Sequence, residues 1–244
     1  MRELYDDAIT GPSLKALEEL AKWYNEKLGN YPLIVGGWAA YCYTKGLGSK
    51  DIDIIFQDDR SKHSTLMLYF MSHGYTERRR DFFDREFVKE VRSWKRTIEV
   101  IVDAASVKRT IIFEGRKARL PWAWAMKHNV KRKVGGATIY VPTIELLLTY
   151  KLGAVLGRNF LLKTGADFEY YRSKLWKDVY DVVSLSGIDL DAKKVGGFLA
   201  ESGLGDYGEE IMQIIEDNYS EETRKLLKEA SLDGIRKILA GRRA

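Results

Sequence analysis

The segments Leu33-Ile-Val-Gly-Gly-Trp-Ala-Ala40 and Ser49-Lys-Asp-Ile-Asp-Ile-Ile-Phe56 are the most informative part of this sequence. The first segment predicts a short buried strand, then two glycines, then a helix over residues 38–45. Glycine lets the backbone approach a ligand closely, and the N–H groups at the start of a helix favour a bound phosphate. The second segment predicts a further strand.

That second strand, expected over residues 51–56, carries two carboxylates. Asp51 and Asp53 point to one face because side chains alternate along a strand, and the isoleucines beside them point to the core. Two carboxylates so close repel each other, and a divalent cation with a preference for oxygen ligands, such as Mg²⁺, relieves that repulsion. Strand, glycine pair, helix and Asp-x-Asp together predict a site for a metal-bound nucleoside triphosphate. Taken singly, the aspartates could be a solvated strand end and the glycines a turn.

The remaining elements change in character near Pro142. Before it we expect a mixed sheet with flanking helices. The helices are expected over residues 13–28, opened by Pro12 and Ser13, and over residues 61–73. The strands are expected over residues 75–79 and 86–92, which pair around residues 81–84, and over residues 96–103 and 138–141. After it we expect helices over 143–158, 173–185, 191–201, 209–218 and 221–239. The sequence therefore predicts an α+β domain over residues 1–142 and an α-helical domain over residues 143–244.

Composition limits the chemistry. The chain has 244 residues, of which 45% are hydrophobic, and no apolar run reaches the roughly 18 residues of a membrane helix, so we expect no membrane association and a cytoplasmic location. One cysteine, Cys42, excludes an internal disulfide and a cysteine-rich zinc site. Three histidines without metal-binding spacing argue against zinc chemistry. The net charge of +5 is compatible with phosphate-bearing partners.

The glycine–aspartate segment resembles the signature of the DNA polymerase β-like nucleotidyltransferase superfamily. That resemblance implies transfer of a nucleoside monophosphate from an NTP, with Asp51 and Asp53 binding one or two Mg²⁺ ions. It also implies a third carboxylate on a neighbouring strand, within Arg96-Thr-Ile-Glu-Val-Ile-Val-Asp103. Glu99, which has hydrophobic residues on both sides, is favoured as a catalytic and metal-binding residue, and Asp103 is the alternative. Glu99 could instead be a solvent-facing residue of an edge strand.

The helical half resembles the AbiEii-type nucleotidyltransferases, which include toxins of toxin–antitoxin systems. Lys151, Arg158 and the Lys177-Asp-Val-Tyr-Asp181 run match its pattern. The two resemblances imply that the nucleotide is bound by Gly36, Gly37, Ser49, Lys50, Lys151, Arg158 and Asp178. From the residues themselves, Lys151 either faces a polar cleft or forms an ordinary interhelical salt bridge with Asp178 or Asp181.

Three functions stay open. The first is a nucleotidyltransferase acting on RNA, including the tRNA 3′ end, which the basic clusters at residues 78–80 and 131–133 favour. The second is an enzyme acting on a small hydroxylated molecule, since antibiotic nucleotidyltransferases carry a similar Gly-Gly-Trp run. The third is a non-catalytic nucleotide-binding or antitoxin-like module. The expected partners are an NTP, RNA and, for a toxin, a cognate antitoxin protein.

Overall fold

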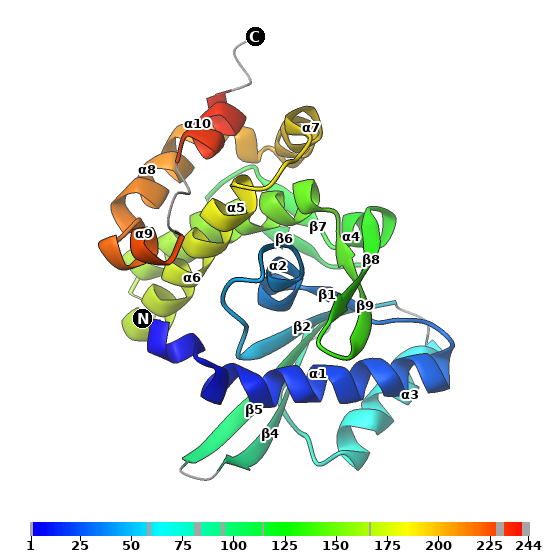
Figure 1. The fold of residues 1–244 in the computed structure, drawn as a ribbon. Coiled ribbons are helices and arrows are strands. Elements are labelled where there is room, and N and C mark those ends of the chain that lie inside the picture. Colours follow the sequence, from blue (N-terminus) through cyan, green and yellow to red (C-terminus); the bar gives the residue numbers. More distant parts are fainter. Residues whose placement is uncertain are drawn as a thin grey trace. The chain divides into compact units, whose positions relative to one another are not determined.

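The computed structural model describes residues 2–57, 60–80, 84–93, 96–113, 115–165, 167–227 and 232–240 (Figure 1). The chain forms two compact units. The sheet unit comprises Arg2–Arg109 and Pro121–Thr143, and the helical unit comprises Thr110–Leu120 and Ile144–Ala244. The chain therefore enters the helical unit twice, first with a short segment and then with the whole C-terminal part.

A seven-stranded mixed sheet forms the centre of the sheet unit, in the order β3-β4-β5-β2-β1-β9-β8. Two of its pairings, β1 with β9 and β2 with β5, are parallel, and the others are antiparallel. The strands are β1 (Leu33–Val35), β2 (Asp51–Phe56), β3 (Thr76–Arg80), β4 (Asp84–Ser93), β5 (Arg96–Ser106), β8 (Asn129–Val134) and β9 (Ala137–Pro142). The expected mixed sheet with flanking helices is confirmed.

One face of the sheet is apolar because hydrophobic residues alternate along its strands. On β2, Ile52 and Ile54 are completely buried, and Val100 and Val102 on β5 are buried beside them. Helix α1 (Asp7–Leu28) contributes to this core with Leu17, Leu20, Ala21 and Tyr24. Figure 1 shows α1 crossing the sheet, and its contacts extend to β2, β5 and β9.

The start of α1 differs from the sequence prediction. The helix begins at Asp7 and not at Ser13, because the Asp6 carboxylate accepts a hydrogen bond from the Ile9 N–H (3.1 Å) and caps the first turn. Pro12 lies inside the helix, where it removes one backbone hydrogen bond. The helix ends at Gly29, whose φ of 61° is the left-handed conformation that closes many helices.

Three further helices belong to the sheet unit: α2 (Gly36–Thr44), α3 (Arg60–Ser72) and the short α4 (Ala123–Lys127), with a 3-10 turn η1 (Arg2–Tyr5) at its start. Helix α2 begins two residues earlier than predicted, at the first glycine itself. Strands β3 and β4 pair as expected, and the connection over residues 81–83 lies outside the described residues. Strand β8 and helix α4 were not predicted, since β8 is rich in charged residues and α4 is only five residues long.

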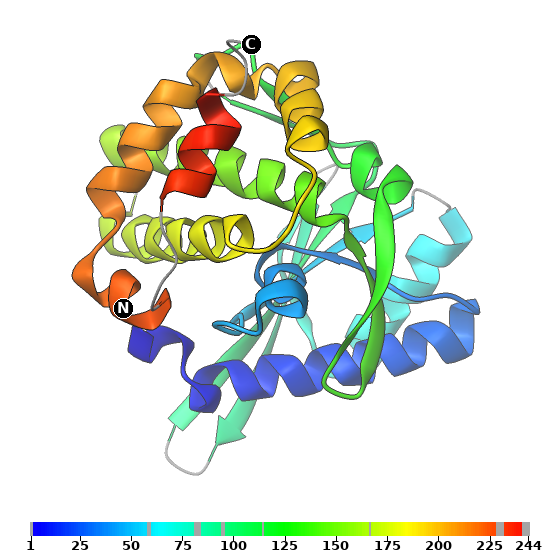
Figure 2. The ribbon, with the colours of Figure 1, turned by 45° about the horizontal axis from the view of Figure 1, so that its top comes forward.

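The helical unit is built on two long antiparallel helices, α5 (Ile144–Lys163) and α6 (Phe168–Ser186), which lie side by side in Figure 2. Both run several residues beyond the predicted helices. They are followed by α7 (Ala192–Ser202), η2 (Leu204–Tyr207), α8 (Gly208–Asn218), α9 (Glu221–Leu227) and α10 (Asp233–Ala240). The single helix predicted over residues 221–239 is described as α9 and α10, and residues 228–231 lie outside the description.

A two-stranded ribbon, β6 (Thr110–Ile112) with β7 (Arg119–Pro121), joins the helical unit by specific contacts. Gly153 on α5 leaves room for it, since a Cβ at that glycine would lie 2.6 Å from Leu120 and 2.9 Å from Phe113. Arg116 forms an ion pair with Glu210 of α8 at 2.5 Å. These contacts explain why residues 110–120 pack with α5 and α8, which follow them in the chain.

Candidate active site

The two glycines after β1 are required by the side chains that lie against them. Gly36 has a φ of 66°, which disfavours any side chain, and a Cβ there would lie 2.7 Å from Asp53 Cγ. A Cβ on Gly37 would lie 2.5 Å from Ser49 Oγ. The backbone at the start of α2 is therefore in direct contact with the predicted acidic strand and with the residue two positions before it.

The start of α2 can hold an anion. Its N-cap residue is Val35, which has no side-chain group to hydrogen-bond the first N–H groups of the helix. Such amides carry partial positive charge and suit phosphate oxygens. Antiparallel pairing places Val35 opposite Asp53, so the N-terminal end of α2 and the carboxylate meet at the same place in the sheet.

Strand β2 orients its two aspartates as predicted. Ile52 and Ile54 point into the core, and Asp51 and Asp53 share the other face. Asp51 is nevertheless mostly buried, with 7% of its surface exposed, while Asp53 is half-buried. The pair therefore lies in a partly desolvated environment, where charge interactions are stronger than on an open surface.

The register of β5 distinguishes the two candidates for a third carboxylate. Asp103 is the direct cross-strand partner of Asp53, and both point to the same face. Glu99 lies on that face four residues earlier, and half of its side chain is exposed. Its carboxylate contacts Arg78 Nη2 at 2.9 Å, and that hydrogen bond raises the pKa of Arg78. The geometry thus favours Asp103, whereas the sequence pattern had favoured Glu99.

The two residues before the acidic strand differ in their surroundings. Ser49 is buried against Gly37, so its hydroxyl lies at the beginning of α2. The Lys50 ammonium lies 5.5 Å from the ring centroid of Tyr5, a cation–π contact within the sheet unit. Both stay predictions as nucleotide-binding residues.

The donor set is suited to Mg²⁺, which prefers carboxylate oxygens. Within the described part of the chain, no group of three or more His, Cys, Asp and Glu side chains is already placed around a common metal position. Mg²⁺ is usually bound by one or two protein carboxylates, with waters and substrate phosphates completing the octahedron. Asp51 and Asp53 fit that type of site, in which the nucleotide itself supplies ligands.

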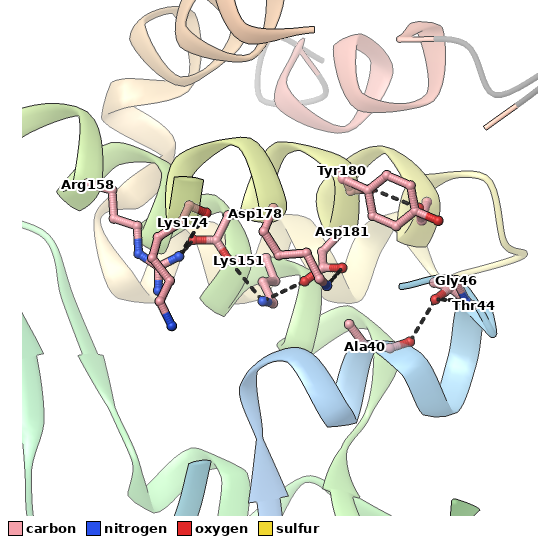
Figure 3. A network of polar contacts seen from close by, with 11 residues as sticks. Ala40, Thr44, Gly46, Lys151, Arg158, Lys174, Asp178, Tyr180 and Asp181 are labelled. Atoms are coloured by element: carbon pink, nitrogen blue, oxygen red, sulfur yellow. Dashed lines mark hydrogen bonds and ion pairs between the residues drawn. The ribbon is translucent and has the colours of Figure 1, made fainter. Parts of the chain in front are cut away.

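The helical unit brings together five charged side chains that the sequence had singled out: Lys151 and Arg158 from α5, and Lys177, Asp178 and Asp181 from α6 (Figure 3). We call them the α5–α6 charge cluster. The Lys151 ammonium lies 2.9 Å from Asp178 and 2.7 Å from Asp181. Arg158 also pairs with Asp178, and Lys177 lies 2.5 Å from Asp181. These ion pairs are the salt-bridge alternative for Lys151. Its role at the nucleotide stays a prediction.

Burial determines how this cluster titrates. Burial lowers the pKa of Lys151, but Asp178 and Asp181 outweigh it, and the pKa lies above its usual range. Burial raises the pKa of Asp178, but Arg158 and Lys151 outweigh it and leave that pKa lowered. The pKa of Lys177 is lowered, because burial outweighs the attraction of Asp181. Lys151 and Asp178 are therefore both charged at neutral pH.

The basic cluster of β8 is solvent-exposed. Lys131, Arg132 and Lys133 are all exposed, and two of them lie over aromatic rings. Lys131 is 4.4 Å from the ring centroid of Tyr31, and the Arg132 guanidinium is 5.1 Å from that of Tyr43. The charges are evident from the sequence, but their contacts with Tyr31 and Tyr43 are not, because these rings come from segments far from β8 in the chain.

Comparison with known proteins adds little. No protein-family model matches the chain, and no curated protein does. Among solved structures, it is similar to an antigenic nucleotidyltransferase-like protein from Paracoccidioides brasiliensis, with 13% identity and a TM-score of 0.47 over 84% of this chain and 92% of that one. It is also similar to JHP933 from Helicobacter pylori, with 12% identity and a TM-score of 0.49 over 93% and 92% of the two chains. Both TM-scores are below 0.5, so neither similarity bears on the function argued below.

Proposed function

We propose that the sheet unit is the catalytic part of a nucleotidyltransferase, which moves a nucleoside monophosphate from an NTP to an acceptor hydroxyl and releases pyrophosphate. The observation that carries this proposal is the meeting of the start of α2 with two carboxylates: Gly36 lies against Asp53, and Asp53 lies opposite Asp103. An anion-binding helix end beside an acidic pair is what a metal-bound triphosphate needs.

Each residue has a distinct role in this proposal. The N–H groups of Gly36 and Gly37, with the Ser49 hydroxyl, hold phosphate oxygens. Asp51 and Asp53 hold Mg²⁺, which when bound neutralises phosphate charge and polarises the phosphoryl group. Asp103 accepts the proton of the acceptor hydroxyl as its oxygen forms a bond to the α-phosphorus. The bond between that phosphorus and the bridging oxygen then breaks, and pyrophosphate leaves with the electron pair.

We propose RNA as the acceptor class. Two exposed cations of β8, Lys131 and Arg132, lie beside tyrosine rings, a combination found in proteins that bind single-stranded nucleic acid. Lys151, Arg158 and Asp178 remain predicted nucleotide-binding residues, and Glu99 remains the alternative to Asp103.

A toxin role with a cognate antitoxin is implied only by the resemblance to the AbiEii-type nucleotidyltransferases. A cytoplasmic location is likewise a proposal; within the described residues no helix has the length and apolar character that a membrane crossing needs.

The direct test is transfer of label. The protein is incubated with each labelled NTP, Mg²⁺ and total RNA, and label on RNA is measured; a panel of small hydroxylated acceptors is run in parallel. Asp51→Asn and Asp53→Asn should each abolish transfer. Asp189→Asn, which changes an exposed aspartate in the helical unit, is the matched control and should transfer normally.

The alternatives give different results. Label on small acceptors and not on RNA would favour the small-molecule enzyme. NTP binding without transfer to any acceptor would favour the non-catalytic module. Transfer that survives both asparagine substitutions would show that the aspartates are not the metal ligands, and the proposed site would be wrong.

A further inference from the structure

A pocket of about 230 Å³ lies in the sheet unit, lined by residues that the proposed catalytic site does not use. Its lining is Tyr24, Asn30, Tyr31, Leu33, Ile55, Gln57, Met126, Asn129 and Tyr140. It is formed by the beginning of β1 and the end of β2, whereas Gly36 and Asp51 lie at the opposite ends of these strands. The volume is smaller than the roughly 300–1,000 Å³ of pockets for drug-sized ligands, so it suits a single ring system.

Strand register gives the pocket an ordered wall. Lys131 pairs with Tyr140, Tyr140 with Leu33, and Leu33 with Ile55, so these four residues form one row across β8, β9, β1 and β2. Residues in such a row point to one face of the sheet. Leu33 and Ile55 are buried, which provides an apolar floor, while Tyr140 is partly exposed.

Two aromatic rings flank this wall. Tyr31 and Tyr140 lie edge to face, with centroids 5.9 Å apart. Both are partly exposed, and the Lys131 ammonium lies over one face of each ring, so the face available for stacking is the opposite one. Stacking on such a face accepts any base and is worth about 1–3 kcal/mol per base in single-strand binding proteins.

Three amide side chains supply hydrogen-bonding groups of both kinds. The Asn129 amide donates to the carbonyls of Ala125 (3.1 Å) and Met126 (2.8 Å), so its nitrogen is fully used and its oxygen remains as an acceptor. The Asn30 oxygen accepts from the Tyr31 N–H at 2.9 Å, which leaves the Asn30 nitrogen as a donor. Gln57, at the exposed end of β2, offers a donor and an acceptor, and within the described residues it has no hydrogen-bond partner.

A cation lies beside the aromatic rings of the pocket. Its lining contains no carboxylate, and the Lys131 ammonium lies 4.4 Å from the Tyr31 ring centroid and 5.9 Å from that of Tyr140. Arg132 and Lys133 follow on the same exposed strand. A ligand that carries a phosphate beside its ring is therefore favoured over a neutral or cationic one.

We propose that this pocket binds the base of a nucleotide, with the ring stacked on Tyr31 or Tyr140, its edge read by Asn129, Asn30 and Gln57, and its phosphate beside Lys131. Donor and acceptor groups side by side on a planar ring are the defining feature of a nucleobase, and amide side chains match them in both directions. The pocket is separate from the proposed catalytic site and does not depend on it. The nucleotide can be free or part of an RNA strand.

Binding is measured by calorimetry without metal ions, so that nucleotide held through Mg²⁺ at the catalytic site does not contribute. The probes are the four ribonucleosides, their 5′-monophosphates, and short single-stranded oligoribonucleotides of each base. Tyr31→Leu should lower the affinity for the preferred base roughly 5- to 150-fold through lost stacking. Gln57→Ala, which removes an exposed side chain and leaves the fold intact, should lower it about 2- to 10-fold.

Matched controls separate the pocket from general effects. Tyr170→Leu removes an exposed tyrosine of the helical unit and should change nothing. Lys131→Met should weaken the binding of monophosphates more than the binding of nucleosides. Lys133→Met, on the same strand, should weaken the binding of mononucleotides less than Lys131→Met does. Repeating the titrations on Asp51→Asn protein keeps this test independent of the proposed transferase, because the affinities should be unchanged.

If monophosphates bind as tightly as oligonucleotides, the ligand is a free nucleotide. If oligonucleotides bind more tightly and their binding weakens with salt, the ligand is an RNA strand. Either outcome supports a base site if Tyr31→Leu and Gln57→Ala weaken it. The proposal is overturned if no probe binds the parent protein, or if both substitutions leave binding unchanged.

Discussion

Gly36 and Asp53 are in direct contact, because the aspartate side chain occupies the space that a Cβ on the glycine would need. The first residue of α2 therefore lies directly against the second carboxylate of β2. The positive φ of Gly36 makes the turn from β1 into α2 possible, and the missing side chain lets the carboxylate approach the helix end.

A substitution at this contact should be more damaging than backbone strain alone. Gly36→Ala should cost about 1–3 kcal/mol from its φ of 66° and a further 1–3 kcal/mol from overlap with Asp53. Gly29→Ala is the matched control, since Gly29 has a φ of 61° but open space around it. Denaturant unfolding of both variants measures the difference. Equal losses would mean that the contact with Asp53 is readily relieved, and the loss in Gly36→Ala should shrink in an Asp53→Ala background.

The two candidates for the third carboxylate should separate in transfer assays. Asp103→Asn should reduce transfer by several orders of magnitude, because Asp103 is the cross-strand neighbour of Asp53. Glu99→Gln should leave transfer close to the parent value, because that exposed carboxylate pairs with Arg78 at the surface. The measurement is single-turnover transfer with both variants at equal folded fraction. A larger loss of transfer in Glu99→Gln than in Asp103→Asn would instead identify Glu99 as the third carboxylate.

The α5–α6 charge cluster should be essential for stability. Lys151→Met leaves two buried aspartates with one cation fewer, and removal of one partner from a buried ion pair costs about 3–5 kcal/mol. Lys225→Met, which removes a lysine from an exposed pair with Glu221, is the control and should have little effect. Thermal and denaturant unfolding provide the comparison. A small loss for Lys151→Met together with weaker NTP binding would instead support the predicted role of this lysine at the nucleotide.

The single cysteine should react slowly in the folded protein. Burial raises the pKa of the Cys42 thiol from 9.0 to about 11, although Lys45 and Arg132 act to lower it. Because the thiolate is the reactive form, a rise of this size reduces its population about 100-fold at pH 8. Alkylation by iodoacetamide should be slow at pH 8, accelerate as the pH rises towards 11, and become fast in urea. Equal rates in folded and unfolded protein would contradict the burial of this thiol.

Several features of the fold and the site were predictable because they depend on local pattern. Alternation along β2 determines that Asp51 and Asp53 share a face while Ile52 and Ile54 enter the core. The glycine pair predicts the turn into α2, and helical periodicity predicts α5, α6, α7 and α8 within a few residues. The helix starts were less predictable, since Asp6 caps α1 well before the proline that seemed to open it.

The residue types that meet at β1, α2 and β2 follow from the sequence alone, because those segments are neighbours in the chain. Three other relationships appear in the folded chain alone: Asp103 lies opposite Asp53, Tyr140 and Leu33 share a row beside Lys131, and four members of the α5–α6 charge cluster are buried. Each of these depends on strand register or helix packing between segments far apart in the chain. A shift of one residue in β5 would turn Asp103 to the opposite face, and the local pattern of β5 contains nothing that specifies its partner on β2.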